Sequence, residues 1–182
     1  MREPQTPAVV IVGAGFSGAV TAANLLTRAA GPLRVVLLNR SGRMARGVAY
    51  GTRSDSHVLN VPAGRMSAFA DDEDDFLRFA RSRDATVAGG TFVPRPLYGE
   101  YLEHVLTSAE AGAGAGVTLD QVVGEAASVE GSDADPRLTV TLTDGRRAAG
   151  ETVVLAVGNY APANPPVQDA SFYQSLRYVR DP

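Results

Sequence analysis

The stretch AVVIVGAGFSGAVTAANLL, from Ala8 to Leu26, decides the fold that we expect. Its first five residues form a continuous apolar run rich in β-branched side chains, which is typical of a strand buried on both faces. Three glycines follow, at Gly13, Gly15 and Gly18, and small residues continue to about residue 30 with helical spacing. The pattern predicts a strand, a tight turn without side chains, and a helix from Ser17 that lies close to a sheet.

A second strand completes the first unit. Gly31 and Pro32 end the predicted helix, and LRVVLLN (residues 33–39) is a second apolar run. A strand, a helix and a strand within about thirty residues indicate a βαβ unit with parallel strands and a right-handed crossover.

The three glycines suit a nucleotide pyrophosphate, which carries two negative charges. Gly13 would make the tight turn, Gly15 would let backbone amides approach phosphate, and Gly18 would let the helix pack on the strand. The strand before the glycines and the helix after them are the context that this motif requires. A purely structural glycine turn is the alternative.

Two other motifs share this position between a strand and a helix. Residues 15–19 resemble a nucleophile elbow, but the segment ends in Ala19, follows the first strand and has no late histidine, so we give a hydrolase little weight. A P-loop would need Gly-Lys-Ser/Thr, and Ala19-Val20 cannot supply it.

The end of the second strand should carry an acidic residue that binds the ribose hydroxyls. Asn39 stands there, 21 residues after Gly18, and Arg40 follows it. Asparagine can still bond a ribose hydroxyl, whereas an Asn-Arg pair also suits the 2′-phosphate of NADP, so both ligands stay open at this point.

Two more helices are predicted after a loop from Arg40 to about Ala70. The first covers DDEDDFLRFARSRD (residues 71–84), and its acidic residues indicate a solvated helix start. The second covers RPLYGEYLEHVLTSA (residues 95–109), with Tyr98 and Tyr101 on its apolar face.

The last third of the chain has the patterns of strands. Residues 111–116 (AGAGAG) are a predicted loop, and residues 117–130 are strand material. RLTVTLTDGRR predicts a hairpin that turns at Asp144-Gly145, and ETVVLAVGN predicts another buried strand that runs into glycine.

Composition limits the classes of protein that the chain can belong to. It has 182 residues, 45% of them hydrophobic, a net charge of −3 and no cysteine. These values fit one globular domain and argue against nucleic acid or a membrane as partner, a disulfide framework and cysteine-based metal sites. Without a signal peptide or a spanning segment, we expect a cytoplasmic protein.

The glycine stretch, the Asp144-Gly145 hairpin and TVVLAVG together resemble the FAD domain of flavoproteins with two dinucleotide-binding domains, the group of glutathione-reductase-like enzymes and flavin monooxygenases. GVAYGT, HVLNVPAGRMS and FVPRPLYGEYL resemble more narrowly a group of actinobacterial and proteobacterial FAD/NAD(P)-binding proteins. The resemblance covers about residues 7–165. It implies a three-layer α/β fold with a Rossmann-like parallel sheet, in which a β-meander follows the third parallel strand.

The resemblance also implies a cofactor site. The pyrophosphate would be held by Gly13, Ala14, Gly15, Phe16, Ser17 and Gly18. Asn39 and Arg40 would face the adenosine ribose, and the backbone of Ala126 would meet the adenine edge. Gly158 would close over the cofactor near the returning strand. Looser candidates for flavin or phosphate contacts are Arg46, Gly47, Asn60 and Arg95. The alternatives are surface charges for the two arginines, a loop hinge for Gly47 and a turn former for Asn60.

The function implied is the FAD-binding part of an NAD(P)H-linked oxidoreductase of the monooxygenase type, with FAD as cofactor and an unidentified small-molecule substrate. We see no acid–base pair whose spacing demands a catalytic role. His57, His104, Tyr50 and Tyr98 could donate protons, but we expect each to be a structural or a solvated residue. The alternative is an NADP(H)-binding domain or a dinucleotide sensor without turnover. We expect a flexible tail over residues 1–6, the domain over residues 7–165, and residues 166–182 as the start of a further segment or a C-terminal tail. A second domain or a partner subunit would complete the enzyme.

Overall fold

The first βαβ unit forms as the opening sequence predicts. In the computed structural model, which describes residues 6–132, 135–159, 163–167 and 169–178, its elements are β1 (Ala8–Val12), α1 (Phe16–Arg28) and β2 (Leu33–Asn39). The helix ends two residues earlier than predicted, because the backbone becomes extended at Ala29. Residues 1–5 of the predicted tail lie outside the described residues, as do residues 168 and 179–182 of the predicted last segment.

Four parallel strands make the central sheet, in the order β3-β2-β1-β7. The outer two are β3 (Val117–Val123) and β7 (Thr152–Leu155). The predicted burial of β7 is only partly confirmed, since β7 lies at the sheet edge and Leu155 is 65% exposed. The prediction missed this because an apolar run shows that a strand can be buried, but not how many neighbours it has.

A three-stranded antiparallel meander forms the second sheet, in the order β4-β5-β6. Its strands are β4 (Ala126–Ser132), β5 (Asp135–Leu142) and β6 (Arg147–Gly150), and Asp144-Gly145 lie in the predicted hairpin turn. The strand material over residues 117–130 therefore divides at Gly124-Glu125 between two sheets. The meander follows the third parallel strand, as the resemblance implies.

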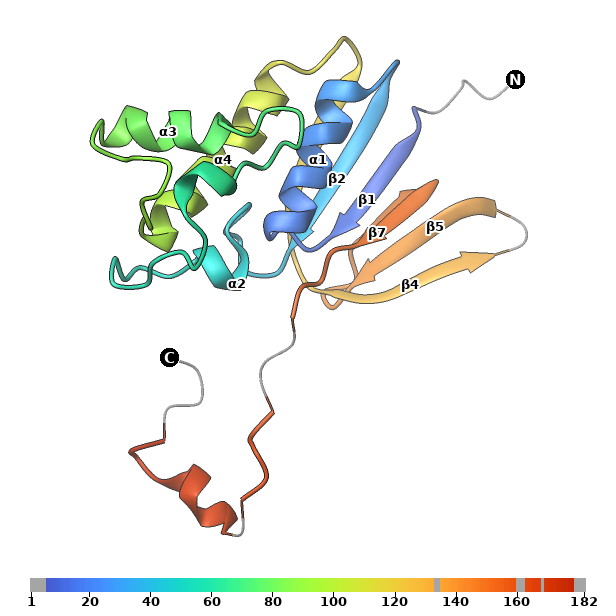
Figure 1. The fold of residues 1–182 in the computed structure, drawn as a ribbon. Helices are drawn as coiled ribbons and strands as arrows, with labels where there is room; N and C mark the ends of the chain where they lie inside the picture. The colour runs from blue at the N-terminus through green and yellow to red at the C-terminus, as the bar shows by residue number, and fades with distance from the viewer. Residues whose placement is uncertain (1–5, 133–134, 160–162, 168, 179–182) are drawn as a thin grey trace.

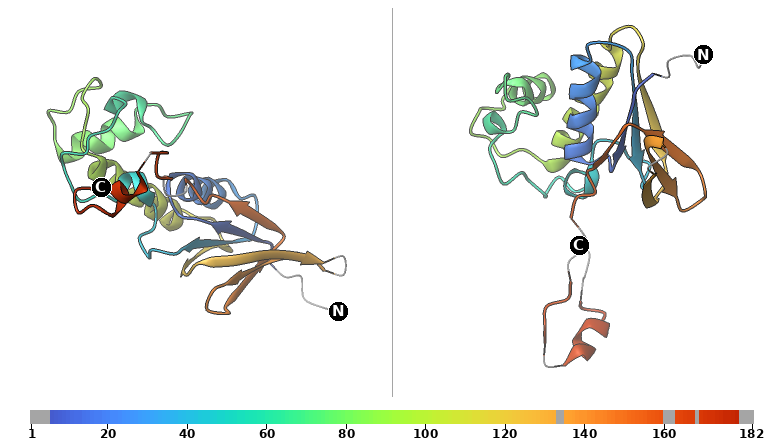
Figure 2. Two further views of the ribbon diagram at one scale, coloured as in Figure 1. Left: turned by 90° about the horizontal axis from the view of Figure 1, so that it is seen from below. Right: turned by 90° about the vertical axis from the view of Figure 1, so that its right-hand side faces the viewer.

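Helices cover one face of the parallel sheet and the meander covers the other, so the fold has the predicted three layers (Figure 2). Ile11, Val35 and Leu37 join the core under the helices, whereas Val10 and Val36 join a smaller core with the meander. Both faces of β1 and β2 are buried, which is why these strands are continuous apolar runs.

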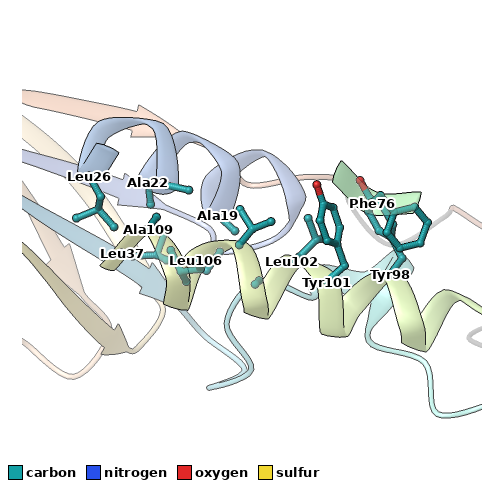
Figure 3. Close-up of a cluster of buried hydrophobic side chains, with 14 of the residues drawn as sticks. Ala19, Ala22, Leu26, Leu37, Phe76, Tyr98, Tyr101, Leu102, Leu106 and Ala109 are labelled. Carbon is teal, nitrogen blue, oxygen red and sulfur yellow. The ribbon is translucent and has the colours of Figure 1, made fainter. Parts of the chain in front are cut away.

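The helical layer contains α1 and α4 (Arg95–Ala111) packed together, with α3 (Asp75–Arg83) outside them (Figure 1). Small side chains of α1, among them Ala19 and Ala22, face Leu102 and Leu106 of α4 (Figure 3). The other elements are α2 (Gly47–Tyr50), η1 (Ala63–Arg65) and η2 (Ala170–Gln174). The first two lie inside the predicted loop, and residues 163–167 and 169–178 extend away from the layers (Figure 1).

The start of α3 differs from the prediction. The helix begins at Asp75, not at residue 71. The carbonyl of Asp72 accepts hydrogen bonds from the Ser67 hydroxyl (2.6 Å) and the Asp75 amide (3.2 Å). These bonds hold residues 72–75 in a turn, so only Asp75 of the acidic run lies in the first helical turn.

Candidate dinucleotide site

The glycine turn joins β1 to α1 at the carboxyl end of the sheet. Gly13 has φ +101°, its amide donates to the Leu38 carbonyl (2.9 Å), and a Cβ there would lie 2.2 Å from the Ala156 carbonyl oxygen. A Cβ at Gly18 would lie 1.9 Å from the Gly13 carbonyl oxygen. These two glycines are therefore required by the protein itself, because β1, α1 and the end of β7 meet where no side chain fits.

Gly15 has different surroundings. It has φ −77°, and the nearest heavy atom of the described chain to an added Cβ would be the Gly47 Cα, at the ordinary contact distance of 3.5 Å. The fold alone would therefore accept alanine here. The missing side chain leaves room in front of the first turn of α1.

The first turn of α1 presents unpaired amides. Gly15 is the N-cap and no side chain caps the helix. Within the part of the chain that the structure describes, none of the amides of residues 14–18 donates a hydrogen bond. Ser17 is exposed, Ala14 is buried, and Phe16 packs against Tyr98 with ring centroids 6.3 Å apart. Free amides at the positive end of a helix dipole form an anion-binding site.

Asn39 ends β2 at the same edge of the sheet. Its Nδ2 donates to the Arg43 carbonyl (2.7 Å) and the Ser41 hydroxyl (3.1 Å). Both amide hydrogens are thus used inside the loop, and no described residue donates to Oδ1. The side chain can therefore accept a hydrogen bond from a ligand but has no hydrogen left to donate.

Arg40 is largely exposed, and its guanidinium lies 3.9 Å from the Glu125 carboxylate. An exposed pair at this distance is weak, but it places a negative charge beside the one cation that sequence analysis assigned to the ribose.

Val123 lies beside Asn39, and sequence analysis did not name it as a candidate. It pairs with Asn39 in the sheet, lies next to Gly42 (a Cβ there would be 3.6 Å from Val123 Cγ1), and is 51% exposed. Ala126, the residue predicted to meet the adenine edge, stands in β4 and packs on the core between the two sheets, and its role stays a prediction. Counting strand residues in register with Asn39 would have found Val123, but register depends on the tertiary structure.

Arg46 and Gly47 lie at the glycine turn, in what we call the α2 segment (residues 45–51). A Cβ at Gly47 would lie 3.0 Å from the Gly15 Cα. The Arg46 guanidinium is not a free surface charge: its side chain is 14% exposed and pairs with Glu103 of α4. The hydrogen bond to Glu103 raises the pKa of Arg46 above its usual range. Direct contact of Arg46 with flavin or phosphate stays a prediction.

The last strand returns to the turn as the resemblance implies. The Ala156 amide donates to the Val12 carbonyl (2.8 Å), and Gly158 follows, exposed and with φ +69°. Arg95 lies beside the bridge between Val58 and Pro94, where its Nε donates to the Val58 carbonyl (3.1 Å), and Asn60 follows Val58 by two residues. Their roles at a cofactor stay predictions.

Of the side chains considered as proton donors, the two tyrosines pack in one aromatic cluster and the two histidines are exposed. Burial raises the pKa of Tyr50 and, more strongly, of Tyr98, which packs among Phe16, Tyr50 and Phe76. His57 Nδ1 lies 2.7 Å from the Thr52 hydroxyl, and His104 stacks on Phe79.

A bare glycine turn with free amides, a hydrogen-bonding residue at the end of β2 and a last strand that returns to the turn define a dinucleotide-binding α/β domain. The chain belongs to the FAD-NAD(P)-binding family, whose profile matches residues 10–160. A comparison with curated protein sequences found no match.

Several solved structures share the fold. Cyclohexanone monooxygenase from Rhodococcus sp. Phi1 bound to NADP+ has a TM-score of 0.61 and 22% identity, covering 91% of this chain and 28% of that chain. An oxidized steroid monooxygenase bound to NADP has a TM-score of 0.58 and 20% identity, covering 90% and 28%. The Diels-Alderase PyrE3 of pyrroindomycin biosynthesis has a TM-score of 0.51 and 18% identity, covering 84% and 32%. This chain therefore spans about a third or less of the length of these proteins.

No helix in residues 6–132, 135–159, 163–167 or 169–178 is long and apolar enough to cross a membrane.

Proposed function

We propose that this chain is the FAD-binding part of a cytoplasmic, flavin-dependent oxidoreductase of the monooxygenase type, and that the ADP moiety of FAD binds at the Gly13–Gly18 turn. The observation that carries the proposal is the set of unpaired amides at residues 14–18 behind a Gly15 that the fold alone does not need. Amides without a hydrogen-bond partner among the described residues and a position kept free of Cβ suit a pyrophosphate.

The residues that would face the adenosine ribose favour FAD over NADP as the ligand. Asn39 offers only the acceptor Oδ1, which suits a ribose hydroxyl that donates. A 2′-phosphate needs donors, and Arg40, the neighbouring cation, lies near the Glu125 carboxylate. The exposed apolar side chain of Val123, beside Asn39, offers a surface for adenine.

A bound flavin would supply the hydride and electron transfer of such an enzyme. The residues described here would bind and orient it: amides of the glycine turn at the pyrophosphate, Asn39 at the ribose and Gly158 near the returning strand. The substrate and the nicotinamide donor would be bound by parts found in the longer proteins of this fold.

Replacement of Gly15 by alanine tests the proposal. The new Cβ fits the ligand-free fold but occupies the approach to the amides, so we expect ADP and FAD to bind about a hundredfold more weakly in calorimetric titrations. Gly31→Ala is the matched control, because a Cβ there meets no described heavy atom within 4 Å. Both variants should unfold near the wild-type temperature. Wild-type affinity in Gly15→Ala would contradict the site.

The same titrations on the wild-type chain should compare ADP with 2′-phospho-ADP. We expect ADP to bind about tenfold more tightly, because Asn39 has no donor for the added phosphate. Tighter binding of 2′-phospho-ADP would favour the NADP(H) alternative.

A further inference from the structure

The α2 segment rests on α4 at a glycine inside that helix. Gly99 is buried, and a Cβ there would lie 2.7 Å from the Tyr50 carbonyl oxygen and 3.0 Å from Arg46 Nη1. Glycine in a helix interior is destabilising, so its presence is explained by what lies against it. The absence of a side chain at Gly99 allows the backbone of the α2 segment to contact α4 directly.

An ion pair also holds the α2 segment against α4. Arg46 Nε lies 2.5 Å from Glu103 Oε1, and Nη2 lies 2.8 Å from Oε2. Two parallel hydrogen bonds to one carboxylate fix the direction of the guanidinium, which a single bond would not do. Arg46 is 14% exposed and Glu103 is 45% exposed, so water reaches this pair from the Glu103 side and screens it less than the Arg83–Glu100 pair, in which both side chains are about half exposed.

The backbone of the α2 segment is strained, so its conformation depends on neighbouring contacts such as the Arg46–Glu103 ion pair. Ala45 is fully buried and has φ +67°, a conformation that disfavours residues with a Cβ, and Gly47 has φ +59°. A conformation of this kind persists only where neighbouring groups hold it. The Arg46–Glu103 pair directly adjoins both residues.

The opposite side of the α2 segment closes on the glycine turn. Gly15 and Gly47 face each other without side chains, so that a Cβ on Gly47 would lie 3.0 Å from the Gly15 Cα. The place of Gly47 therefore sets how wide the space is in front of the α1 amides.

We infer that Glu103 is a positioning residue for the dinucleotide site, which acts through Arg46 to hold Gly47 against Gly15. The inference rests on the proposed function, and it gives Arg46 a different task from direct phosphate binding. The two tasks predict opposite effects. If Arg46 bound phosphate, removing the charge of Glu103 would free the guanidinium and strengthen binding; if Arg46 positions Gly47, removal weakens binding.

The variant Glu103→Gln distinguishes them. In the full 182-residue chain we expect ADP to bind about tenfold more weakly, and amides of residues 45–51 to exchange hydrogen about tenfold faster without ligand. Glu110→Gln is the matched control: it lies on the same helix, and its carboxylate lies 3.5 Å from Nε2 of Gln121 in β3. It should change neither quantity. Arg46→Gln should weaken ADP binding about as much as Glu103→Gln, and the double variant no further.

The outcomes separate the two proposals. If the wild-type chain does not bind ADP, the proposed function is wrong and the positioning role falls with it. If the wild type binds ADP and Glu103→Gln binds it equally well or more tightly, only the positioning role is wrong. The same holds if Glu110→Gln weakens binding as much as Glu103→Gln, or if the effects of Arg46→Gln and Glu103→Gln add.

Discussion

Gly13 and Gly15 stand two residues apart and serve different purposes. At Gly13 the protein itself leaves no space, since the Ala156 carbonyl oxygen would lie 2.2 Å from a Cβ and φ is +101°. At Gly15 the protein leaves ordinary space and a common backbone conformation. A glycine that the fold does not need, next to unpaired amides, is the residue-scale sign of a ligand.

Two buried tyrosines of α4 offer a comparison at the same scale. The Tyr101 hydroxyl donates to Asp75 Oδ2 (2.6 Å) and accepts from the Ala68 amide (3.0 Å), whereas the Tyr98 hydroxyl has no partner among the described residues. We predict that Tyr101→Phe lowers the free energy of unfolding by about 2 kcal/mol, because both partners lose a hydrogen bond.

Urea denaturation at neutral pH measures this loss. Tyr98→Phe is its control and should change the free energy of unfolding by less than about 0.5 kcal/mol. Equal losses in the two variants would show that ring packing, and not the hydroxyl, sets the stability at Tyr101.

At the scale of the element, α4 combines several tasks on one helix. Its apolar face packs on α1, Gly99 and Glu103 hold the α2 segment, and Tyr101 ties it to the start of α3. The apolar face was predicted from the spacing of its residues. The tasks of Gly99 and Glu103 were not, because they depend on a segment about fifty residues away in the sequence.

The buried tyrosines of α4 also predict how stability depends on pH. Burial raises the pKa of Tyr98 and Tyr101 well above the ordinary value of about 10. The unfolded chain therefore loses these protons first, so the stabilising effect of the neutral forms is complete below about pH 10 and is lost as pH rises further. We expect urea midpoints to fall above about pH 10, and less steeply in Tyr98→Phe. Identical alkaline slopes in the two proteins would contradict this.

For the whole molecule, the three layers bring segments from the two ends of the sequence together at one sheet edge. The glycine turn, Asn39, Val123 and Ala156 come from four strand ends, and β7 reaches β1 only after the meander. Parallel strands end at the same side, so their carboxyl ends build one site.

The same topology leaves β7 as an open edge. Leu155 is 65% exposed and Val157 is 57% exposed, and no strand of the described residues pairs with the outer side of β7. An unpaired apolar edge favours association with other chains. We predict that the 182-residue chain self-associates as its concentration rises, and that Leu155→Lys reduces this association while changing unfolding by less than about 0.5 kcal/mol.

Sedimentation velocity over a range of concentrations measures this. Val48→Lys, which alters an exposed apolar side chain of α2, is the control and should associate like the wild type. Association that persists unchanged in Leu155→Lys would place the contact elsewhere.

The sequence by itself determined what depends on near neighbours in the chain: the apolar runs of β1 and β2, the small face of α1, the Asp144-Gly145 hairpin and the glycine turn. These follow from backbone conformation and side-chain periodicity, which act over a few residues. Only the tertiary structure decided the edge position of β7, the place of Val123 beside Asn39 and the pairing of Arg46 with Glu103. Register, strand order and ion pairs arise between segments far apart in the chain, and no local pattern encodes them.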